Sequence, residues 1–342
     1  MPIVRHRLEP GDRLPDFTLA DQTGMLRPFY MRVEGRGTII FVDCDETLRW
    51  ALRGLEDKYR AAELDCYVIA DTAEGADPWP CSLADNTGQV RQAIRDMSGH
   101  RLGPAAMRPL AILLDRNQRV LALADEGDLA QWALARWSAE PPSTPVAEIR
   151  HVAPVLTIPN LLSRADCSTL IARWHAMGHE EGSVSSMVKG EVVTRVYEDL
   201  KKRRDHRLED PAIRKPLMAI IARRLGPELN KAFFFGGSVR FDRVLIACYD
   251  AGRGDYFRRH RDNQTPNTAD RRFALTVNLN SDEYDGGELI FPEFGDYRYK
   301  PDTGAAVVFS CSLLHEALPV TRGQRFALLT FICDVAEPAN KR

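Results

Sequence analysis

The sequence lacks several features that would at once assign a chain to a special class. Its seven cysteines are scattered without a C-x-x-C pair, which argues against a disulfide framework or a zinc site and is typical of a reducing cytoplasm. No apolar run approaches a membrane span, and the first residues lack the apolar core of a signal peptide. With 46 basic and 48 acidic residues, the net charge of −2 gives no general attraction to nucleic acid or anionic membranes. We therefore expect a cytoplasmic protein that binds neither.

Length and composition predict two domains. The 342 residues, 44% of them hydrophobic, are enough for two packed cores. Three prolines within five residues after Glu140 block regular structure at that point. We expect a first domain over 1–140, a linker over 141–152 and a second domain over 153–342.

The first domain shows alternating strand and helix patterns. The expected elements are a strand over 38–42, a helix over 47–63, a strand over 64–70, a helix over 88–97, a hairpin of strands over 110–115 and 120–123, and a helix over 129–137. Strand, helix and strand followed by a hairpin and a helix indicate an α/β sandwich.

Two runs of the first domain, 10–24 and 43–50, carry a resemblance to a known family. They are similar to peroxiredoxins, which have a thioredoxin fold and a P-x-x-x-T-x-x-C motif at the peroxidase site. Thr47 keeps the threonine, but Asp43 stands in place of the proline and Trp50 in place of the cysteine. Tryptophan cannot form a thiolate. The resemblance therefore implies a thioredoxin-like domain that is redox-inert and acts as a scaffold or a partner-binding surface, such as a homodimer contact.

One cysteine of this domain needs separate consideration. Cys44 lies near the end of the expected strand, and a small buried hydrophobic residue is the preferred interpretation. The negative charge of the neighbouring Asp43 is expected to disfavour a thiolate there. A thiol peroxidase acting from this domain is kept as the alternative.

The second domain begins with helices and continues with many short strands. Helices are expected from Arg164, with Ser163 as N-cap, and over 211–231. From Ser238 the pattern changes to period two, and many short strands with turn signals indicate a double-stranded β-helix, the jelly-roll barrel. Along its first strand, the odd positions from Val239 to Tyr249 are expected to share one face.

Two histidines and one aspartate in this domain form a candidate metal site. His260 and Asp262 stand two residues apart, so in a strand both side chains point to the same side. His315 follows after two more expected strands and can supply the third ligand. Two imidazoles and one carboxylate are the facial triad of non-haem Fe(II) oxygenases, which leaves the opposite face of the ion open.

Arg325 completes the pattern. It follows His315 by ten residues, after a turn at 321–324 that returns it beside the third ligand, where its guanidinium could bind a carboxylate in a dry pocket. Together with Tyr249 and the run 285–291, these residues resemble the 2-oxoglutarate- and Fe(II)-dependent dioxygenases of the prolyl-4-hydroxylase-like branch. The resemblance implies that Arg325 binds the distal carboxylate of 2-oxoglutarate and that Tyr249 assists. It implies Fe(II) as the cofactor and 2-oxoglutarate and O₂ as co-substrates, and it leaves ascorbate open as a further cofactor.

Two further regions of the domain bear on the site. In the strand over 273–280, Thr276 and Asn278 share a polar face and are candidate pocket residues. The hydrophilic segment 181–215 is interpreted as a solvated helix face, with a mobile lid over the pocket as the alternative.

The resemblance implies hydroxylation of an unactivated C–H bond, with succinate and CO₂ released. A prolyl peptide, a free amino acid and other small molecules all remain open as substrates. The rival hypotheses are the thiol peroxidase and a metal-binding sensor without turnover.

Overall fold

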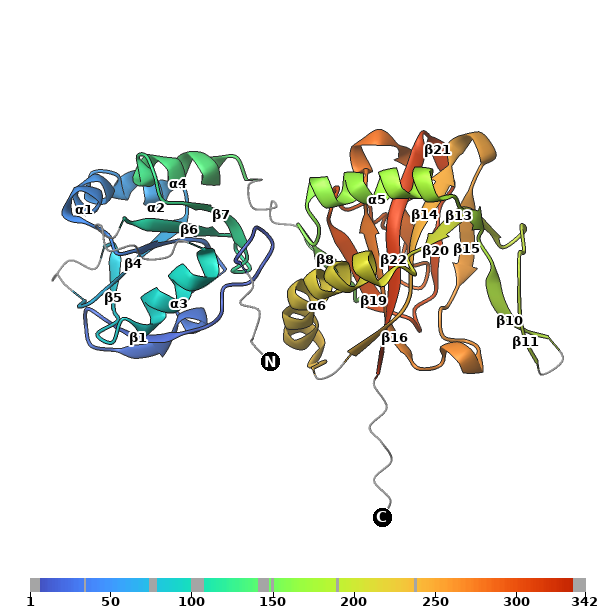
Figure 1. Ribbon diagram of the computed structural model, residues 1–342, viewed down its shortest axis with the longest axis horizontal. Coiled ribbons are helices and arrows are strands. Elements are labelled where there is room, and N and C mark those ends of the chain that lie inside the picture. The colour runs from blue at the N-terminus through green and yellow to red at the C-terminus, as the bar shows by residue number, and fades with distance from the viewer. Residues whose placement is uncertain are drawn as a thin grey trace, which may run out of the picture. The chain divides into compact units, whose positions relative to one another are not determined.

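The computed structural model describes residues 7–33, 35–73, 79–99, 108–140, 148, 151–188, 191–236 and 239–334. The chain divides into two compact units between Val146 and Ala147, each with its own hydrophobic cores (Figure 1). This division falls within the expected linker, of which only residues 148, 151 and 152 belong to the described part of the chain. Among the described residues, no helix combines the length and the apolar character needed to cross a membrane.

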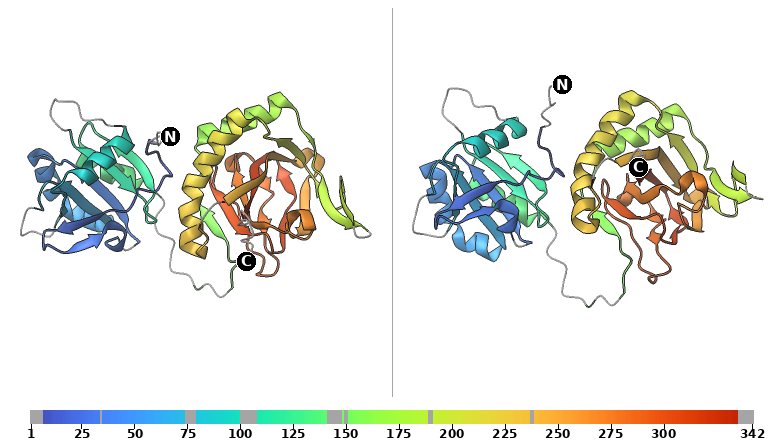
Figure 2. Two further views of the ribbon diagram at one scale, coloured as in Figure 1. Left: turned by 60° about the horizontal axis from the view of Figure 1, so that its bottom comes forward. Right: turned by 90° about the horizontal axis from the view of Figure 1, so that it is seen from below.

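The first unit is built on a seven-stranded mixed sheet in the order β2-β1-β5-β4-β3-β6-β7. Its strands are β1 (Thr18–Asp21), β2 (Leu26–Pro28), β3 (Gly37–Val42), β4 (Leu64–Ala70), β5 (Cys81–Ala84), β6 (Leu110–Leu114) and β7 (Val120–Ala124). Its helices are η1 (Phe29–Met31), α1 (Glu46–Arg53), α2 (Glu56–Ala61), α3 (Gln89–Ser98) and α4 (Leu129–Ser138). β3, β4 and β5 run parallel, and the hairpin β6–β7 continues the sheet antiparallel. Helices α1, α2 and α4 pack on one face and α3 on the other (Figure 2).

The expected α/β pattern of this unit is confirmed, with two differences. The single helix expected over 47–63 is two helices, because α1 ends at Gly54 and Leu55 is buried between them. The short strands β1, β2 and β5 were not expected, because their mixed polar composition gives a weak periodic signal.

The second unit consists of two facing groups of antiparallel strands. The larger sheet has the order β8 (Leu156–Ile158), β19 (Ala306–Ser310), β16 (Arg271–Asn278), β22 (Gln324–Asp334), β14 (Val239–Asp250), β13 (Arg204–Arg207) and β9 (Glu180–Glu181). The smaller one has the order β12 (Lys201–Lys202), β15 (Tyr256–His260), β20 (His315–Ala317) and β18 (Leu289–Ile290). Two separate pairs are β10 (Val184–Val188) with β11 (Glu191–Arg195) and β17 (Asp285–Gly286) with β21 (Val320–Arg322). The short helices η2 (Ala251–Arg253), η3 (Pro266–Thr268) and η4 (Ser281–Glu283) connect strands.

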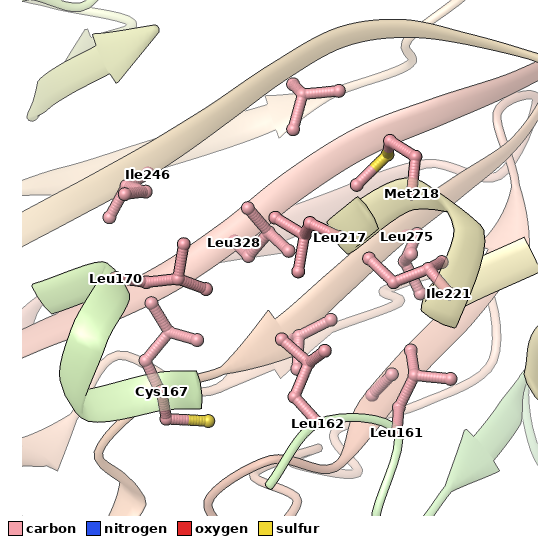
Figure 3. Packing of buried hydrophobic residues seen from close by; sticks show 14 of the residues in the cluster. Leu161, Leu162, Cys167, Leu170, Leu217, Met218, Ile221, Ile246, Leu275 and Leu328 are labelled. Carbon is pink, nitrogen blue, oxygen red and sulfur yellow. The ribbon is translucent and has the colours of Figure 1, made fainter. Parts of the chain in front are cut away.

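Two long helices cover the outer face of the larger sheet. α5 (Arg164–Met177) begins at Ser163, whose side chain forms a capping box with Asp166, and α6 (Pro211–Phe233) begins at the N-cap Asp210. Their apolar side chains and those of β14, β16 and β22 form one core (Figure 3). The expected helices over 164 onward and 211–231 are thus confirmed. Because the helices fill the outer face, the inner face of the sheet is left for the site.

The first long strand, β14, departs from the expected alternation. The ladder with β22 shifts register between Asp242 and Leu245, which marks a β-bulge. Before the bulge, Phe241 packs against the helix-facing core, whereas after it Ile246 does. The expectation that all odd positions from Val239 to Tyr249 share one face is therefore wrong. At the bulge the strand changes register, so odd positions face the helices before it and the cavity after it.

The segment 181–215 is also different from the expectation. Rather than a solvated helix face, it contains the short strands β12 and β13, which pair with β15 and β14. Lys201, Arg203 and Asp205 are buried. Their spacing of two residues fits an extended chain, which places all three on one side. The alternative of a lid stays a prediction.

Candidate functional site

The three expected metal ligands lie together at the ends of two paired strands. His260 closes β15 and is the register partner of His315 at the start of β20. Nε2 of His260 lies 3.5 Å from one oxygen of Asp262, and Nε2 of His315 lies 3.4 Å from the other. One ligand atom from each of the three residues lies within 4.8 Å of those of the others. A single ion can therefore contact all three side chains.

The hydrogen bonds of the two histidines favour metal binding. Nδ1 of His260 donates to the carbonyl oxygen of Arg258 at 2.7 Å, and Nδ1 of His315 donates to that of Leu313 at 3.0 Å. A carbonyl can only accept, so in both rings the proton resides on Nδ1. The Nε2 lone pairs are then directed to the site, and the donor set of two imidazoles and one carboxylate fits Fe(II).

The protonation states of this cluster suit a cation as well. Burial would raise the pKa of Asp262, but the neighbouring His315 and His260 lower it to about 2. Burial lowers the pKa of His315 to about 4. At neutral pH both residues are in the form that a metal requires.

Aromatic rings hold the histidines in place. The ring of Phe257 stacks on His260 with centroids 3.5 Å apart, and Phe309 meets His315 edge-on at 4.7 Å. These contacts reduce the freedom of both imidazoles before any ligand binds.

Arg325 lies in β22 directly opposite Tyr249 in β14, and both side chains are buried. Its Nη2 donates to Oδ1 of Asn278 at a long 3.4 Å, and its Nε has no hydrogen-bond partner among the described residues. A buried guanidinium with unmade hydrogen bonds is a fitting partner for a carboxylate. Arg325 therefore fits the carboxylate of a co-substrate.

Of the two expected pocket residues on β16, Thr276 lies in the cavity lining and Asn278 does not. The buried hydroxyl of Thr276 has no hydrogen-bond partner in the described part of the chain. The amide nitrogen of Asn278 donates to the carbonyl of Pro301 while its oxygen accepts from Arg325, so it orients the arginine.

Two consecutive glycines precede β18, and the second of them makes room for Arg325. Gly286 and Gly287 have φ angles of 73° and 66°, a region that side chains rarely adopt. A Cβ on Gly287 would come within 2.8 Å of Val320 and 3.1 Å of Cδ of Arg325. The positive φ angles favour glycine at both positions, and the close approach of Arg325 favours it at Gly287.

The candidate ligands and Arg325 surround one cavity of about 370 Å³, whose lining includes His260, Asp262, His315, Arg325 and Thr276. It lies between the two groups of strands of the second unit, because β14, β16 and β22 contribute residues from one side and β15 and β20 from the other. The cavity is large enough for a small co-substrate together with part of a second molecule.

Sequence reasoning missed a buried charged cluster on the wall of this cavity. Arg203 forms an ion pair with Asp205 at 2.8 Å and donates from Nη1 to the hydroxyl of Tyr249 at 2.7 Å. Lys201 contacts the same Asp205 at 3.2 Å. Tyr249 is therefore held beside Arg325 by Arg203. The alternation of residues 201, 203 and 205 was the signal in the sequence that could have revealed them.

The residues considered in the first unit do not form a comparable site. Trp50 is 73% exposed and Thr47 is exposed on α1, while Cys44 is half-buried against the core. Burial raises the pKa of the Cys44 thiol to about 12. A thiolate at Cys44 is thus disfavoured as expected, but burial and the charge of Asp45 are the causes, whereas the carboxylate of Asp43 forms ion pairs with two arginines.

Comparison with known proteins agrees with this geometry. Residues 244–333 match the family model of the 2OG-Fe(II) oxygenase superfamily. The second unit thus contains a 2OG-Fe(II) oxygenase domain, and the resemblance noted from His260, Asp262, His315 and Arg325 is confirmed.

Curated relatives are PKHD-type hydroxylases. The chain is 26% identical over 205 residues to one from Xylella fastidiosa, covering 55% of this chain and 82% of the relative. It is 36% identical over 80 residues to one from Alteromonas mediterranea, covering 23% and 35%. The chain spans less than half the length of most of the curated relatives it matches.

Solved structures are similar to each part of the chain. A prolyl-4-hydroxylase from Pseudomonas putida covers 54% of this chain and 93% of its own, with 23% identity and a TM-score of 0.41. The peroxidoxin BcpB from Mycobacterium tuberculosis covers 40% of this chain and 100% of its own, with 18% identity and a TM-score of 0.32.

Proposed function

We propose that this chain is an Fe(II)- and 2-oxoglutarate-dependent dioxygenase that hydroxylates a prolyl, peptidyl or small amino-acid-like substrate. The observation that carries the proposal is the presence, in one cavity, of a His-Asp-His cluster and a buried arginine with unmade hydrogen bonds. The match to the oxygenase family over 244–333 supports the same reaction class.

In this proposal His260, Asp262 and His315 hold the metal. Fe(II) bound there supplies the activation of O₂, coupled to decarboxylation of 2-oxoglutarate to succinate and CO₂. The protein provides three ligands on one side and leaves the other side open to the cavity. Phe257 and Phe309 keep the imidazoles oriented.

Arg325 orients the co-substrate. Its guanidinium receives the distal carboxylate, and the free hydroxyl of Thr276 is a further donor to the same molecule. Tyr249 supports the arginine with its ring, whose centroid lies 5.2 Å from the guanidinium carbon. Because Arg203 fixes the tyrosine hydroxyl, this wall of the cavity is ordered before any ligand binds.

We further infer that the two groups of strands constitute a double-stranded β-helix and that the first unit is a redox-inert domain with a thioredoxin-like fold. The topology of the larger and the smaller sheet around one cavity supports the former. The exposed Trp50 and the raised pKa of Cys44 support the latter. A cytoplasmic setting is proposed because all seven cysteines are free thiols.

One assay separates the proposed reaction from its rivals. Purified full-length chain is incubated with Fe(II), 2-oxoglutarate and air, and both succinate release and peroxide consumption are measured. The dioxygenase releases succinate even without primary substrate, at the slow uncoupled rate. A thiol peroxidase would consume peroxide in the presence of a thiol, and a metal sensor would do neither. Absence of succinate from iron-loaded protein contradicts the proposal.

A further inference from the structure

The cavity wall is strongly cationic. Its lining contains six basic side chains and, besides Asp262, no other acidic one among the described residues. The six are Lys201, Arg203, Arg243, Arg261, Arg271 and Arg325. Four of them are buried and Arg243 and Arg261 are half-buried, so the anionic partner of each one is informative.

Four of the six have a carboxylate partner within the protein. Lys201 and Arg203 share the carboxylate of Asp205. The remaining two pairs lie at the rim and on the wall: Arg261 with Glu293 at 2.7 Å and Arg271 with Asp242 at 2.8 Å. These four cations need no ligand.

Two cations are left, and the co-substrate accounts for one. Arg325 and Arg243 form no ion pair within the described part of the chain, and Arg243 also forms no hydrogen bond there. Arg325 is the partner of 2-oxoglutarate in the proposed function. Arg243 then remains as a charged donor in the cavity for which neither the protein nor the co-substrate provides an anion.

The backbone directs this side chain into the cavity at a cost. Arg243 has φ of 50°, which is uncommon for any residue other than glycine, and it lies in the β-bulge of β14. In an uninterrupted strand, position 243 would share the side of Phe241, which packs against the helices. The bulge instead places Arg243 beside Leu245 and Tyr249 on the cavity wall.

The surroundings of Arg243 are unfavourable to a cation. Burial lowers its pKa, and the positive charges of Arg271, Arg207 and Arg203 lower it further. Asp242, the acidic group that opposes them, is itself paired with Arg271. An incoming anion would therefore relieve repulsion as well as fill the hydrogen-bonding capacity of the guanidinium.

We propose that Arg243 binds an oxyanion of the primary substrate, a carboxylate, phosphate or sulfate group, and that the enzyme therefore selects acidic substrates. The inference rests on the proposed function, since it assigns Arg325 to 2-oxoglutarate. It narrows the substrate class to molecules that carry a negatively charged oxygen group.

Sulfate is the probe for this site, measured by isothermal titration calorimetry with full-length protein loaded with Zn(II) and saturated with 2-oxoglutarate. Under these conditions Arg325 is occupied. We expect wild-type protein to bind sulfate and Arg243→Gln to bind it at least about tenfold more weakly, the loss of roughly one charge-assisted contact. Arg240→Gln is the matched control, because Arg240 lies on the same strand but is exposed and paired with Asp270.

A second variant protects the test against misfolding. Arg243→Gly suits the positive φ and should fold, yet it should lose sulfate binding as Arg243→Gln does. Sulfate binding that is absent from the wild type, or equal in the wild type and both Arg243 variants, overturns the proposal.

Wild-type succinate release is measured in parallel. If it fails while sulfate binding depends on Arg243, the oxygenase function is wrong and the anion site stands. If succinate is released but sulfate binding does not depend on Arg243, the proposed anion site is wrong and the proposed oxygenase function is retained.

Discussion

Tyr249 and Arg325 are register partners in the β14–β22 ladder, with the guanidinium carbon of Arg325 5.2 Å from the centre of the tyrosine ring. The pairing joins two strands that are distant in sequence and places the candidate carboxylate-binding group on the side of the cavity opposite β15 and β20, which carry His260 and His315. The register of this ladder therefore determines where Arg325 lies in the site.

Replacing Arg325 should weaken 2-oxoglutarate binding selectively. In Arg325→Leu a buried charge-assisted pair is lost, which costs about 2–4 kcal/mol and so raises the 2-oxoglutarate requirement by roughly 30- to 1000-fold. Iron binding should be spared, because Arg325 contacts none of the three ligands in the described structure. The control is Arg322→Leu, on the same hairpin but exposed and paired with Asp285. An unchanged 2-oxoglutarate requirement in Arg325→Leu would contradict the assignment of Arg325 to the co-substrate carboxylate.

Gly287→Ala should displace Arg325 by steric pressure. The new methyl group would approach Val320 and Cδ of Arg325, at a cost of about 1–3 kcal/mol in stability, and 2-oxoglutarate should bind more weakly. Gly254→Ala is the matched control, because Gly254 has the same φ of 66° but its added methyl group would meet no heavy atom within 4 Å. Chemical denaturation and 2-oxoglutarate titration measure both effects. Equal behaviour of the two variants would mean that the close approach to Arg325 has no consequence.

Lys201 should make stability depend on pH. Burial, and then the charge of Arg203, lower its pKa from 10.5 to about 7, while Asp205 opposes the shift. Between these two pH values the folded chain has released a proton that the unfolded chain still binds. The free energy of unfolding of wild type relative to Lys201→Met should therefore rise as pH increases from about 7 to 10.5. A difference between wild type and Lys201→Met that is constant over this range contradicts the prediction.

The first unit should not reduce peroxide. Burial raises the pKa of Cys44 to about 12, so at neutral pH almost no thiolate is present. We expect the full-length chain with a thiol reductant to consume peroxide no faster than Cys44→Ser. A rate that depends on Cys44 would show that the unit kept its redox chemistry.

The sequence predicted the parts of the fold that strong local patterns encode. Helices α5 and α6, the strands β3, β4 and β6, and the alternation of Thr276 and Asn278 on one face of β16 follow from periodicity and capping. The triad and Arg325 could be proposed from the sequence because their spacing follows from strand and hairpin geometry.

The remaining features depend on tertiary structure. The bulge that turns Arg243 into the cavity leaves no clear periodic signal, since inserting one residue only exchanges the two faces of β14. Lys201 and Arg203 look solvated in a linear sequence, and only the nearby Asp205 and Tyr249 make their burial tolerable. Similarly, the arginine partners of Asp43 lie on α3, far along the chain, and local reasoning about Cys44 did not consider them.

The most direct test of the account compares iron content and succinate release in wild type and His260→Ala. His151→Ala, at an exposed histidine outside the cavity lining, is the control. We predict that wild type and His151→Ala bind one iron per chain and release succinate from 2-oxoglutarate in an oxygen-dependent reaction, whereas His260→Ala loses both properties. Wild-type iron content and succinate release in His260→Ala would contradict the account.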